Sequence, residues 1–319
     1  MKRLILFMTS LLVGFGGMQT IWGAPPIPRA FSLAVVSDIH LDLDKLRNAL
    51  GDMTAQNIDA LVLVGDSCDG QDHEYAAIKR VLATTPRPPN LFFTMGNHEY
   101  YASYHKDGGE YDEMGFPNGE TTRKCQARFN RFRGADPDGP VYYDAWVNGY
   151  HLIFLSGEKS RMDDASLFDD AVLTTAQLSW LNVKLREKAT PGKPTFVFLH
   201  QPFPNTVSGS RDATSIRPAG ELRNILSHFP QTLFFSGHTH WELNLPTTHY
   251  TDKSSTVHMF NTSSLRDPYN TRDVPIQRDM SEGLLVQVLP GQVIVKGRDF
   301  LGHAFIKGQV YRVGIPTGR

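Results

Sequence analysis

The chain contains 319 residues, of which 40% are hydrophobic and 20% are charged, a composition typical of a globular protein with a full hydrophobic core. Its 32 Lys and Arg residues nearly balance its 33 Asp and Glu residues, giving a net charge of −1. This balance excludes a global basic field that would attract nucleic acid or an anionic membrane, and leaves open only a local basic patch.

Residues 1–24 have the layout of a secretory signal peptide. Lys2 and Arg3 precede an apolar run over residues 4–17, and small residues follow at Gly23 and Ala24. The run is shorter than the roughly 20 residues that span a membrane. We therefore expect a secreted or periplasmic protein with no stable membrane anchor after cleavage. An uncleaved anchor and a buried first helix are the alternatives. The Pro-rich stretch 24–30 is typical of a short tether.

Six short apolar runs follow, and each ends in a polar cluster. They are FSLAVVSDIH (31–40), ALVLVGDS (60–67), NLFFTMGNHE (90–99), YHLIFLSGE (150–158), TFVFLHQP (195–202) and TLFFSGHTH (232–240). Short runs that are apolar on both faces indicate strands buried in a layered sheet.

Helical patterns lie between several of these runs, over residues 43–56, 74–82 and 174–188. In the last of them Thr174 is placed to cap the helix, with Gln177 three residues later. Its apolar face would consist of Leu178, Leu181 and Leu185. Strands that alternate with helices predict an α/β layered fold.

The chain from residue 30 to residue 319 is predicted to form one domain. Its polar, Gly-rich segment 100–142 is expected to be a cap-like insertion. After residue 283 the pattern GLLVQVL, a Pro-Gly turn and QVIVKGRDF predict a β-hairpin, and a further strand is predicted at 309–313. We expect this tail to complete a second sheet. Cys68 and Cys125 could pair in an exported protein, although buried or free thiols are the interpretation we prefer.

Five of the predicted strands end in residues that can bind metal. The candidate ligands are Asp38, His40, Asp66, Asn97, His200, His238 and His240. Singly, each has a structural explanation as a turn former, a helix cap or a hydrogen-bonded histidine. Residues two apart in an extended chain point to the same side, and ligands of open α/β sheets bind beyond the carboxyl ends of strands. Five such ends at one sheet edge therefore favour a shared metal site.

The motifs Asp-x-His, Gly-Asp, Gly-Asn-His-Glu, His and Gly-His-x-His resemble those of the calcineurin-like metallophosphoesterase superfamily, in order and approximate spacing, over residues 37–240. The block Asn-Thr-Ser-Ser at 261–264 is also similar to the family. The resemblance implies a four-layer α/β/β/α sandwich of two mixed β-sheets flanked by helices. It places the metal site at the carboxyl ends of the strands.

The resemblance also implies a role for each motif residue. Two divalent metal ions, Mn, Fe or Zn, would bind: one to Asp38, His40 and His240, the other to Asn97, His200 and His238, with Asp66 bridging both. His98 would face the substrate as a catalytic residue, and Glu99 is expected to orient its imidazole through a hydrogen bond. The stretch GDSCDG lacks the tyrosine of the purple acid phosphatase branch, so an iron–tyrosinate site is not expected.

The implied function is that of an exported phosphoesterase. It would hydrolyse small phosphomonoesters or phosphodiesters, nucleotides among them, by attack of metal-bound hydroxide, with His98 protonating the leaving group. Tyr100, Tyr101, Tyr104 and His105 would line the substrate pocket or pack the insertion. Arg161 and Arg211 would bind a distal phosphate or lie solvated at the surface. The neutral chain gives no strong nucleic-acid signal, and the oligomeric state stays open. The alternative is a catalytically silent binding scaffold of the same fold.

Overall fold

The computed structural model of the chain describes residues 31–106, 109–187, 190–211, 215–251, 256–276 and 279–316. The predicted signal peptide over residues 1–24 and the tether after it lie outside the described residues, so both stay predictions. Within the described ranges, no helix combines the length and the apolar character that crossing a membrane requires.

The described strands form two six-stranded sheets and a small two-stranded one. The first sheet has the order β14-β13-β12-β1-β2-β3. Its strands are β1 (Phe31–Val36), β2 (Ala60–Val64), β3 (Asn90–Thr94), β12 (Glu282–Leu289), β13 (Gln292–Asp299) and β14 (Ala304–Gly314). Strands β1, β2 and β3 are parallel, and β12 runs antiparallel to β1.

This order corrects the expectation for the C-terminal tail. The hairpin and the strand after it form as predicted, but they join the sheet that contains β1 and do not complete the second sheet. The local pattern determines a hairpin and its turn. Which strand the hairpin pairs with depends on which strand elsewhere in the fold has an unpaired edge. Here it is β1, which pairs with β2 along one edge and with β12 of the hairpin along the other.

The second sheet has the order β10-β11-β9-β7-β5-β4. Its strands are β4 (Tyr143–Val147), β5 (Tyr150–Phe154), β7 (Thr195–Phe198), β9 (Thr232–Ser236), β10 (His249–Thr251) and β11 (His258–Asn261). The four inner strands are parallel and the two edge strands are antiparallel. The short strands β6 (Ala171–Val172) and β8 (Ile216–Arg217) pair apart from it.

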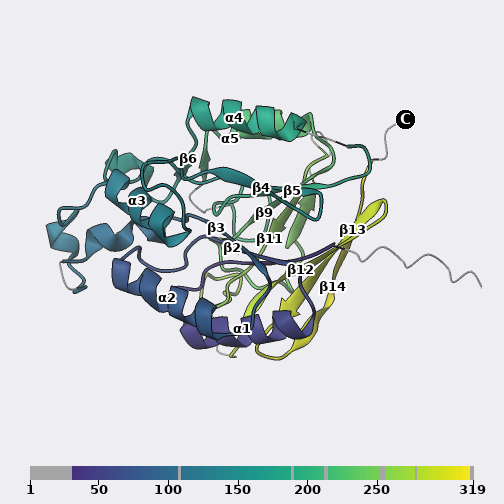
Figure 1. Ribbon diagram of the computed structural model, residues 1–319, viewed down its shortest axis with the longest axis horizontal. Coiled ribbons are helices and arrows are strands. Elements are labelled where there is room, and N and C mark those ends of the chain that lie inside the picture. The colour runs from purple at the N-terminus through teal and green to yellow at the C-terminus, as the bar shows by residue number, and fades with distance from the viewer. Residues whose placement is uncertain are drawn as a thin grey trace, which may run out of the picture.

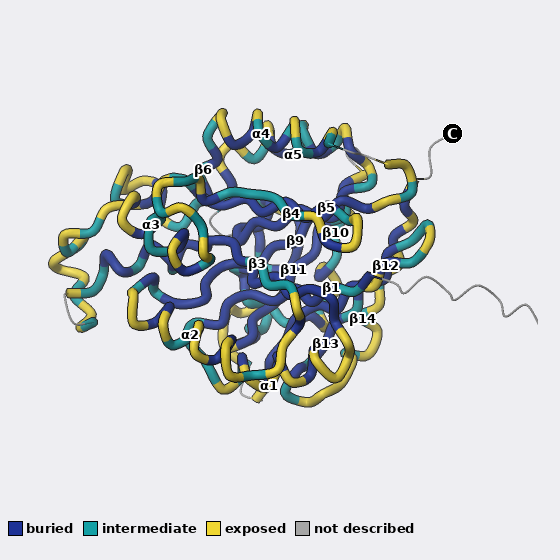
Figure 2. The backbone as a smooth tube through the Cα atoms, in the orientation of Figure 1, coloured by how far each residue is buried: buried dark blue, intermediate teal, exposed yellow. Residues whose placement is uncertain are grey.

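Helices cover the outer faces of the two sheets (Figure 1). Helices α1 (Leu43–Ala55), α2 (Asp72–Thr84) and α3 (Thr122–Phe132) share a core with the first sheet, and α4 (Thr175–Arg186) and α5 (Ala219–Ser227) share one with the second. A third core lies between the sheets, and the central backbone is buried accordingly (Figure 2). The four-layer α/β/β/α sandwich is confirmed.

Aromatic pairs fix the register of the second sheet. Phe154, Phe198, Phe235 and Phe260 are fully buried and are direct partners on successive neighbouring strands. Their ring centroids lie 5.3, 5.5 and 5.2 Å apart in that order. A slip of one residue would turn each ring to the opposite face of the sheet. The pairing therefore determines where the strands end, and with it the positions of the side chains that follow them.

Helix α4 follows its prediction with one difference. The Thr174 side chain accepts a hydrogen bond from the Gln177 amide, and Leu178, Leu181 and Leu185 are buried. The Gln177 side chain does not return to the cap, however. It bonds the backbone N–H and C=O of Ser156 at 3.1 and 2.9 Å. The first turn of α4 is thereby fastened to the loop after β5. Helix α4 ends at Arg186, and Lys188 lies outside the described residues.

The segment 100–142 contains the larger part of the 3₁₀ helix η1 (His98–Tyr104), the 3₁₀ helix η2 (Glu113–Gly115) and α3. Phe132 of α3 stacks on Tyr75 of α2 with a centroid separation of 4.6 Å. Part of this segment is thus core, and its role as a cap stays a prediction. Cys68 and Cys125 are both buried free thiols, in agreement with the preferred interpretation.

Candidate metal centre and active site

The candidate ligands follow strands of both large sheets. Asp38, Asp66 and Asn97 come after β1, β2 and β3 of the first sheet. His200 comes after β7, and the His238–His240 pair comes after β9, in the second sheet. The ligands therefore meet where two facing sheets end, which corrects the expectation of a single sheet edge.

The backbone at the ligands is turned rather than extended. Asp38, His40, Asp66, His238 and His240 have φ values of 55°, 42°, 50°, 71° and 58°. Residues other than glycine rarely adopt this left-handed region, which costs on the order of 1–3 kcal/mol each. The spacing of two residues thus brings side chains together through tight turns, and not through strand alternation as expected. Strain concentrated at one place is typical of a functional site.

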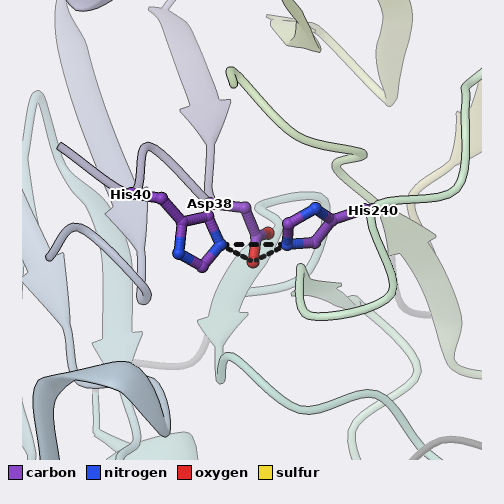
Figure 3. Close-up of side chains that lie close together, drawn as sticks. All are labelled: Asp38, His40 and His240. Carbon is purple, nitrogen blue, oxygen red and sulfur yellow. Dashed lines mark hydrogen bonds and ion pairs between the residues drawn. The ribbon is translucent and has the colours of Figure 1, made fainter. Parts of the chain in front are cut away.

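The first ligand cluster consists of Asp38, His40 and His240 (Figure 3). Asp38 Oδ1 lies 3.1 Å from His240 Nε2 and 3.8 Å from His40 Nε2, and the two Nε2 atoms are 3.0 Å apart. The other oxygen, Asp38 Oδ2, accepts hydrogen bonds from the Ser37 hydroxyl and the His238 amide. Asp38 Oδ1 is buried and has no hydrogen-bond partner among the described residues, as expected for a metal-facing atom.

The second cluster consists of Asp66, His200 and His238. His200 Nδ1 donates to the Val64 carbonyl at 2.7 Å, which turns Nε2 toward Asp66 Oδ2, 3.0 Å away. His200 Nε2 makes no hydrogen bond with good geometry within the described chain. The same holds for the buried Asn97 Oδ1. Leaving such groups unsatisfied costs roughly 1–3 kcal/mol each, and a bound cation would remove that cost.

Asp66 lies within reach of both clusters. Its carboxylate groups with His200 and His238, and also with His40 and His98. A carboxylate between two donor sets is suited to bridge two ions, the role that the family resemblance implies for Asp66. The group of Asp66, His40 and His98 offers His98 as a further possible metal donor. The role of His98 therefore depends on which residue holds its imidazole ring.

Opposite charges lie close together in the site. Burial opposes ionisation of Asp38, but the neighbouring His240 and His200 outweigh it and hold the pKa of Asp38 well below its usual value. Burial likewise opposes a charge on His200, but Asp66 and Asp38 raise its pKa to about 10. Burial and the charge of His200 lower the pKa of His238 to about 3. A neutral imidazole among ionised carboxylates is a ready metal ligand.

His98 is held by Asp69, a residue that the sequence analysis missed. His98 Nδ1 donates to Asp69 Oδ1 at 2.8 Å, and the other Asp69 oxygen lies 3.2 Å from His105 Nε2. Burial lowers the pKa of His98, but Asp66 and Asp69 outweigh it and raise the value to about 9. Asp69 stands three residues after Asp66 in the sequence GDSCD. A second acidic residue so soon after a candidate ligand was the signal in the sequence that could have revealed it.

Glu99 does not orient the His98 ring, and this part of the prediction is wrong. Its carboxylate accepts the backbone N–H groups of Asp66, Ser67 and Gly96 at 3.0, 2.8 and 2.6 Å. It therefore ties the turn after β2 to the turn after β3. Glu99 thus holds the turns that carry the candidate ligands Asp66 and Asn97, whereas Asp69 holds the ring of His98.

A model of the calcineurin-like phosphoesterase family matches residues 31–242. The chain belongs to this family. A comparison with curated proteins finds no match. The family and the clustered donors together indicate a dinuclear site for divalent metal ions.

Solved structures, two phosphatases among them, share the fold of this member of the calcineurin-like phosphoesterase family. A dimetal phosphatase from Danio rerio is 14% identical with a TM-score of 0.60, covering 90% of this chain and 99% of its own. Purple acid phosphatase PPD1 from yellow lupin is 10% identical with a TM-score of 0.59, covering 89% of this chain and 54% of its own. GAP50, described as the anchor in the inner membrane complex of Plasmodium, is 12% identical with a TM-score of 0.50, covering 91% and 90%.

Two glycines of the phosphoesterase motifs allow the close approach of backbone and ligand. A Cβ on Gly96 would lie 2.0 Å from Asp66 Oδ1, and one on Gly237 would lie 2.6 Å from Asp38 Oδ2. Neither contact is sterically allowed. The glycines before Asn97 and His238 are thus required by the crowding of the site.

The block at 261–264 supports the first cluster from behind. Thr262 Oγ1 lies 2.7 Å from the Ser37 hydroxyl that bonds Asp38, and Ser264 Oγ donates to the Asp38 carbonyl at 2.9 Å. The Asn261 side-chain amide donates to the Trp241 carbonyl at 2.9 Å. These bonds join the ends of β1 and β9, which carry the members of the first cluster.

Three of the residues predicted to line the substrate pocket lie together. Tyr100, Tyr101 and Tyr104 all line a small pocket beside Asn97. The Tyr100 hydroxyl also donates to the Gly157 carbonyl. Arg161, at the same pocket, donates to the Tyr104 hydroxyl, whereas Arg211 lies in a second, larger groove next to His238.

Proposed function

We propose that the chain is an exported, metal-dependent phosphoesterase that hydrolyses small phosphomonoesters or phosphodiesters with Mn, Fe or Zn. One observation carries the proposal. Donors that follow five strands form three overlapping clusters. Three buried atoms of the candidate ligands have no hydrogen-bond partner in the described chain: Asp38 Oδ1, Asn97 Oδ1 and His200 Nε2. Export is supported by the signal-like sequence of residues 1–24.

The ligands divide the work of binding between them. Asp38, His40 and His240 would hold one ion, Asn97, His200 and His238 the other, and Asp66 both. Two divalent ions, when bound, supply positive charge for the phosphoryl group and lower the pKa of the attacking water. The ionised Asp38 and Asp66 neutralise part of that charge, and the backbone turns fix the donors before substrate arrives.

His98 would donate a proton to the leaving oxygen. Asp69 engages its Nδ1, so Nε2 is the ring nitrogen that would exchange a proton with substrate. The carboxylate fixes the tautomer and the direction of the ring. A positioned acid of this kind typically contributes about 10²–10⁴-fold to the rate.

The alternative is a binding scaffold without catalysis, and GAP50 shares the fold at a TM-score of 0.50. A scaffold has no need for strained ligands, glycines cleared for close approach and an oriented His98. All of these are present here. The site geometry therefore favours the hydrolase.

A metal-reconstitution assay tests the proposal. The purified protein is stripped with a chelator and restored separately with Mn²⁺, Fe²⁺ and Zn²⁺. Hydrolysis of p-nitrophenyl phosphate and of bis-p-nitrophenyl phosphate is then compared. We expect activity to disappear with the metals and to return with at least one of them, and the preferred compound separates monoesterase from diesterase. A protein that binds two ions and hydrolyses neither compound would support the scaffold.

A further inference from the structure

An open groove of about 590 Å³ lies directly beside the metal ligand His238. Its volume falls within the range of about 300–1,000 Å³ that small-molecule sites occupy. Its lining consists of the loop 205–211 after β7 together with His238, Thr239, Trp241, Thr247, Tyr269 and Asp273. A substrate whose phosphoryl group reached the second cluster would have this groove next to it.

Two aromatic side chains line the groove from the metal site outward. Trp241 and Tyr269 are partners in a parallel β-bridge, so their side chains leave the backbone on the same side. The Tyr269 amide donates to the His240 carbonyl at 2.7 Å, and its ring centroid is 4.8 Å from that of His240. The aromatic surface thus begins at a metal ligand, where the non-reacting part of a substrate would lie.

The walls of the groove are already fixed. The Trp241 indole N–H donates to Asp273. Gly209 packs against the same indole: a Cβ there would lie 3.0 Å from two ring atoms, and its φ is +79°. The Ser208 hydroxyl pairs with that of Thr247 at 2.7 Å. A rigid site loses little ordering entropy when a ligand binds.

The other side of the second cluster offers little room. The pocket beside Asn97 has a volume of only about 20 Å³, roughly enough for one water molecule. Tyr101 closes it, because its hydroxyl donates to Asp169 at 2.7 Å and accepts from the Asn97 amide at 3.3 Å. A bulky ester group therefore has space on the His238 side and not on the Asn97 side.

We propose that this groove is a subsite for a nucleoside, so that the substrate is a nucleotide or a nucleoside phosphodiester whose base stacks on Trp241 or Tyr269. The proposal rests on the proposed phosphoesterase function. A base has the flat π face that these rings bind. An acyl chain would bury the polar backbone of loop 205–211 without partners, at a cost in affinity, whereas a ribose offers hydroxyl groups. The exposed Arg211 at the rim adds positive charge suited to a further phosphate.

Two chromogenic diesters test the subsite in the Mn²⁺-loaded protein. The p-nitrophenyl ester of thymidine 5′-monophosphate and methyl p-nitrophenyl phosphate release the same leaving group and differ only in the group that would fill the groove. We expect kcat/KM to be at least about tenfold higher for the thymidine ester. Trp241→Ala should lower this ratio about tenfold or more, chiefly through KM, and Trp241→Phe should keep most of it.

Matched controls separate stacking from damage to the neighbouring His240. Trp146→Ala removes a tryptophan from the edge strand β4 and should leave the ratio unchanged. Metal content, measured for each variant, should stay at the wild-type value. A ratio that Trp241→Ala leaves unchanged while its metal content is intact would overturn the proposal.

A binding measurement separates failure of the subsite from failure of the proposed function. A non-hydrolysable thymidine phosphonate and methylphosphonate are titrated calorimetrically into the Mn²⁺-loaded protein. We expect the nucleoside compound to bind at least about tenfold more tightly, whether or not the diesters are cleaved. Equal affinities would overturn the subsite even in an active enzyme, whereas tight nucleoside binding without any hydrolysis would overturn only the phosphoesterase function.

Discussion

At the scale of single residues, the geometry of the site depends on the hydrogen bonds that orient each candidate ligand as much as on the candidate ligands themselves. The Val64 carbonyl orients the His200 ring, and the Ser37 hydroxyl bonds one oxygen of Asp38, while the other oxygen is buried without a hydrogen-bond partner in the described chain. The Asp69 carboxylate orients the His98 ring by accepting a hydrogen bond from its Nδ1. Such supporting bonds fix tautomers and ring directions, and they distinguish His98 from the candidate ligand histidines around it.

Replacing His98 tests this separation. We expect His98→Ala to lower kcat by about 10²–10⁴-fold and to leave both ions bound, because its ring is held by Asp69 and not by the metal clusters. Steady-state kinetics and elemental analysis measure the two effects. His228→Ala, at an exposed histidine after α5, is the matched control. If metal content collapses in His98→Ala, then His98 is a ligand, as its grouping with His40 and Asp66 would allow.

Glu282 gives the protein a predictable pH dependence of stability. It is fully buried at the start of β12, where its carboxylate accepts the Leu243 amide at 2.8 Å. Burial, with the charges of Glu242 and Asp299, raises its pKa from 4.5 to about 7. Between these two values the unfolded chain releases a proton that the folded chain keeps. The free energy of unfolding therefore falls as the pH rises through this window, by roughly 3 kcal/mol in total.

The variant Glu282→Gln should remove this loss, because an amide keeps the bond from Leu243 and does not ionise. We expect its Tm to exceed the wild-type value at pH 8 and to match it near pH 4.5. Thermal unfolding at both values measures the difference. The exposed Glu221→Gln should shift Tm equally little at both. A Glu282→Gln protein that gains no stability at pH 8 would show that the carboxylate is stabilised in a way that its contacts do not reveal.

At the scale of elements, the outer faces of the sheets pack against helices, whereas the candidate site lies at the ends of the strands. Helix α4 buries Leu181 against the outer face of the second sheet, whereas the ligands follow the strand ends. The stacked phenylalanines set where those strands end. Damage to the outer layer should therefore lower stability without changing the chemistry of the molecules that stay folded.

The variant Leu181→Ala tests this division. The side chain is fully buried, so its truncation should cost about 2–5 kcal/mol of unfolding free energy, with kcat per folded molecule unchanged. Denaturant unfolding and active-site titration report the two quantities. Val183→Ala on the same helix, where the side chain is 65% exposed, should cost less than about 0.5 kcal/mol. A fall in kcat in folded Leu181→Ala would show that α4 is coupled to the site.

At the scale of the whole molecule, the metal ions would join the two sheets. Asp38 and Asp66 belong to the first sheet, and His200, His238 and His240 to the second. Without a cation, the buried carboxylates are balanced only by protonated histidines such as His200. Ions that bind the folded chain alone stabilise it by mass action.

Metal removal should therefore lower the Tm. At a free Mn²⁺ concentration of about 100 times Kd, the gain in unfolding free energy per site is roughly 2.7 kcal/mol. Differential scanning calorimetry of the stripped and restored protein measures it. In Asp66→Ala the shift should vanish, because the bridging ligand of both ions is lost. Two ions retained in that variant would refute the bridging assignment.

The sequence by itself determined the alternation of strands and helices, the strand-end motifs and the seven candidate ligands, because buried strands and tight polar turns leave local patterns. Only the tertiary structure decided which sheet the C-terminal hairpin joins, that the ligands come from two facing sheets, and that Asp69 rather than Glu99 holds His98. These features depend on contacts between residues far apart in the chain and on turns with left-handed backbone conformation. Their geometry depends on how whole layers pack, which no local pattern contains.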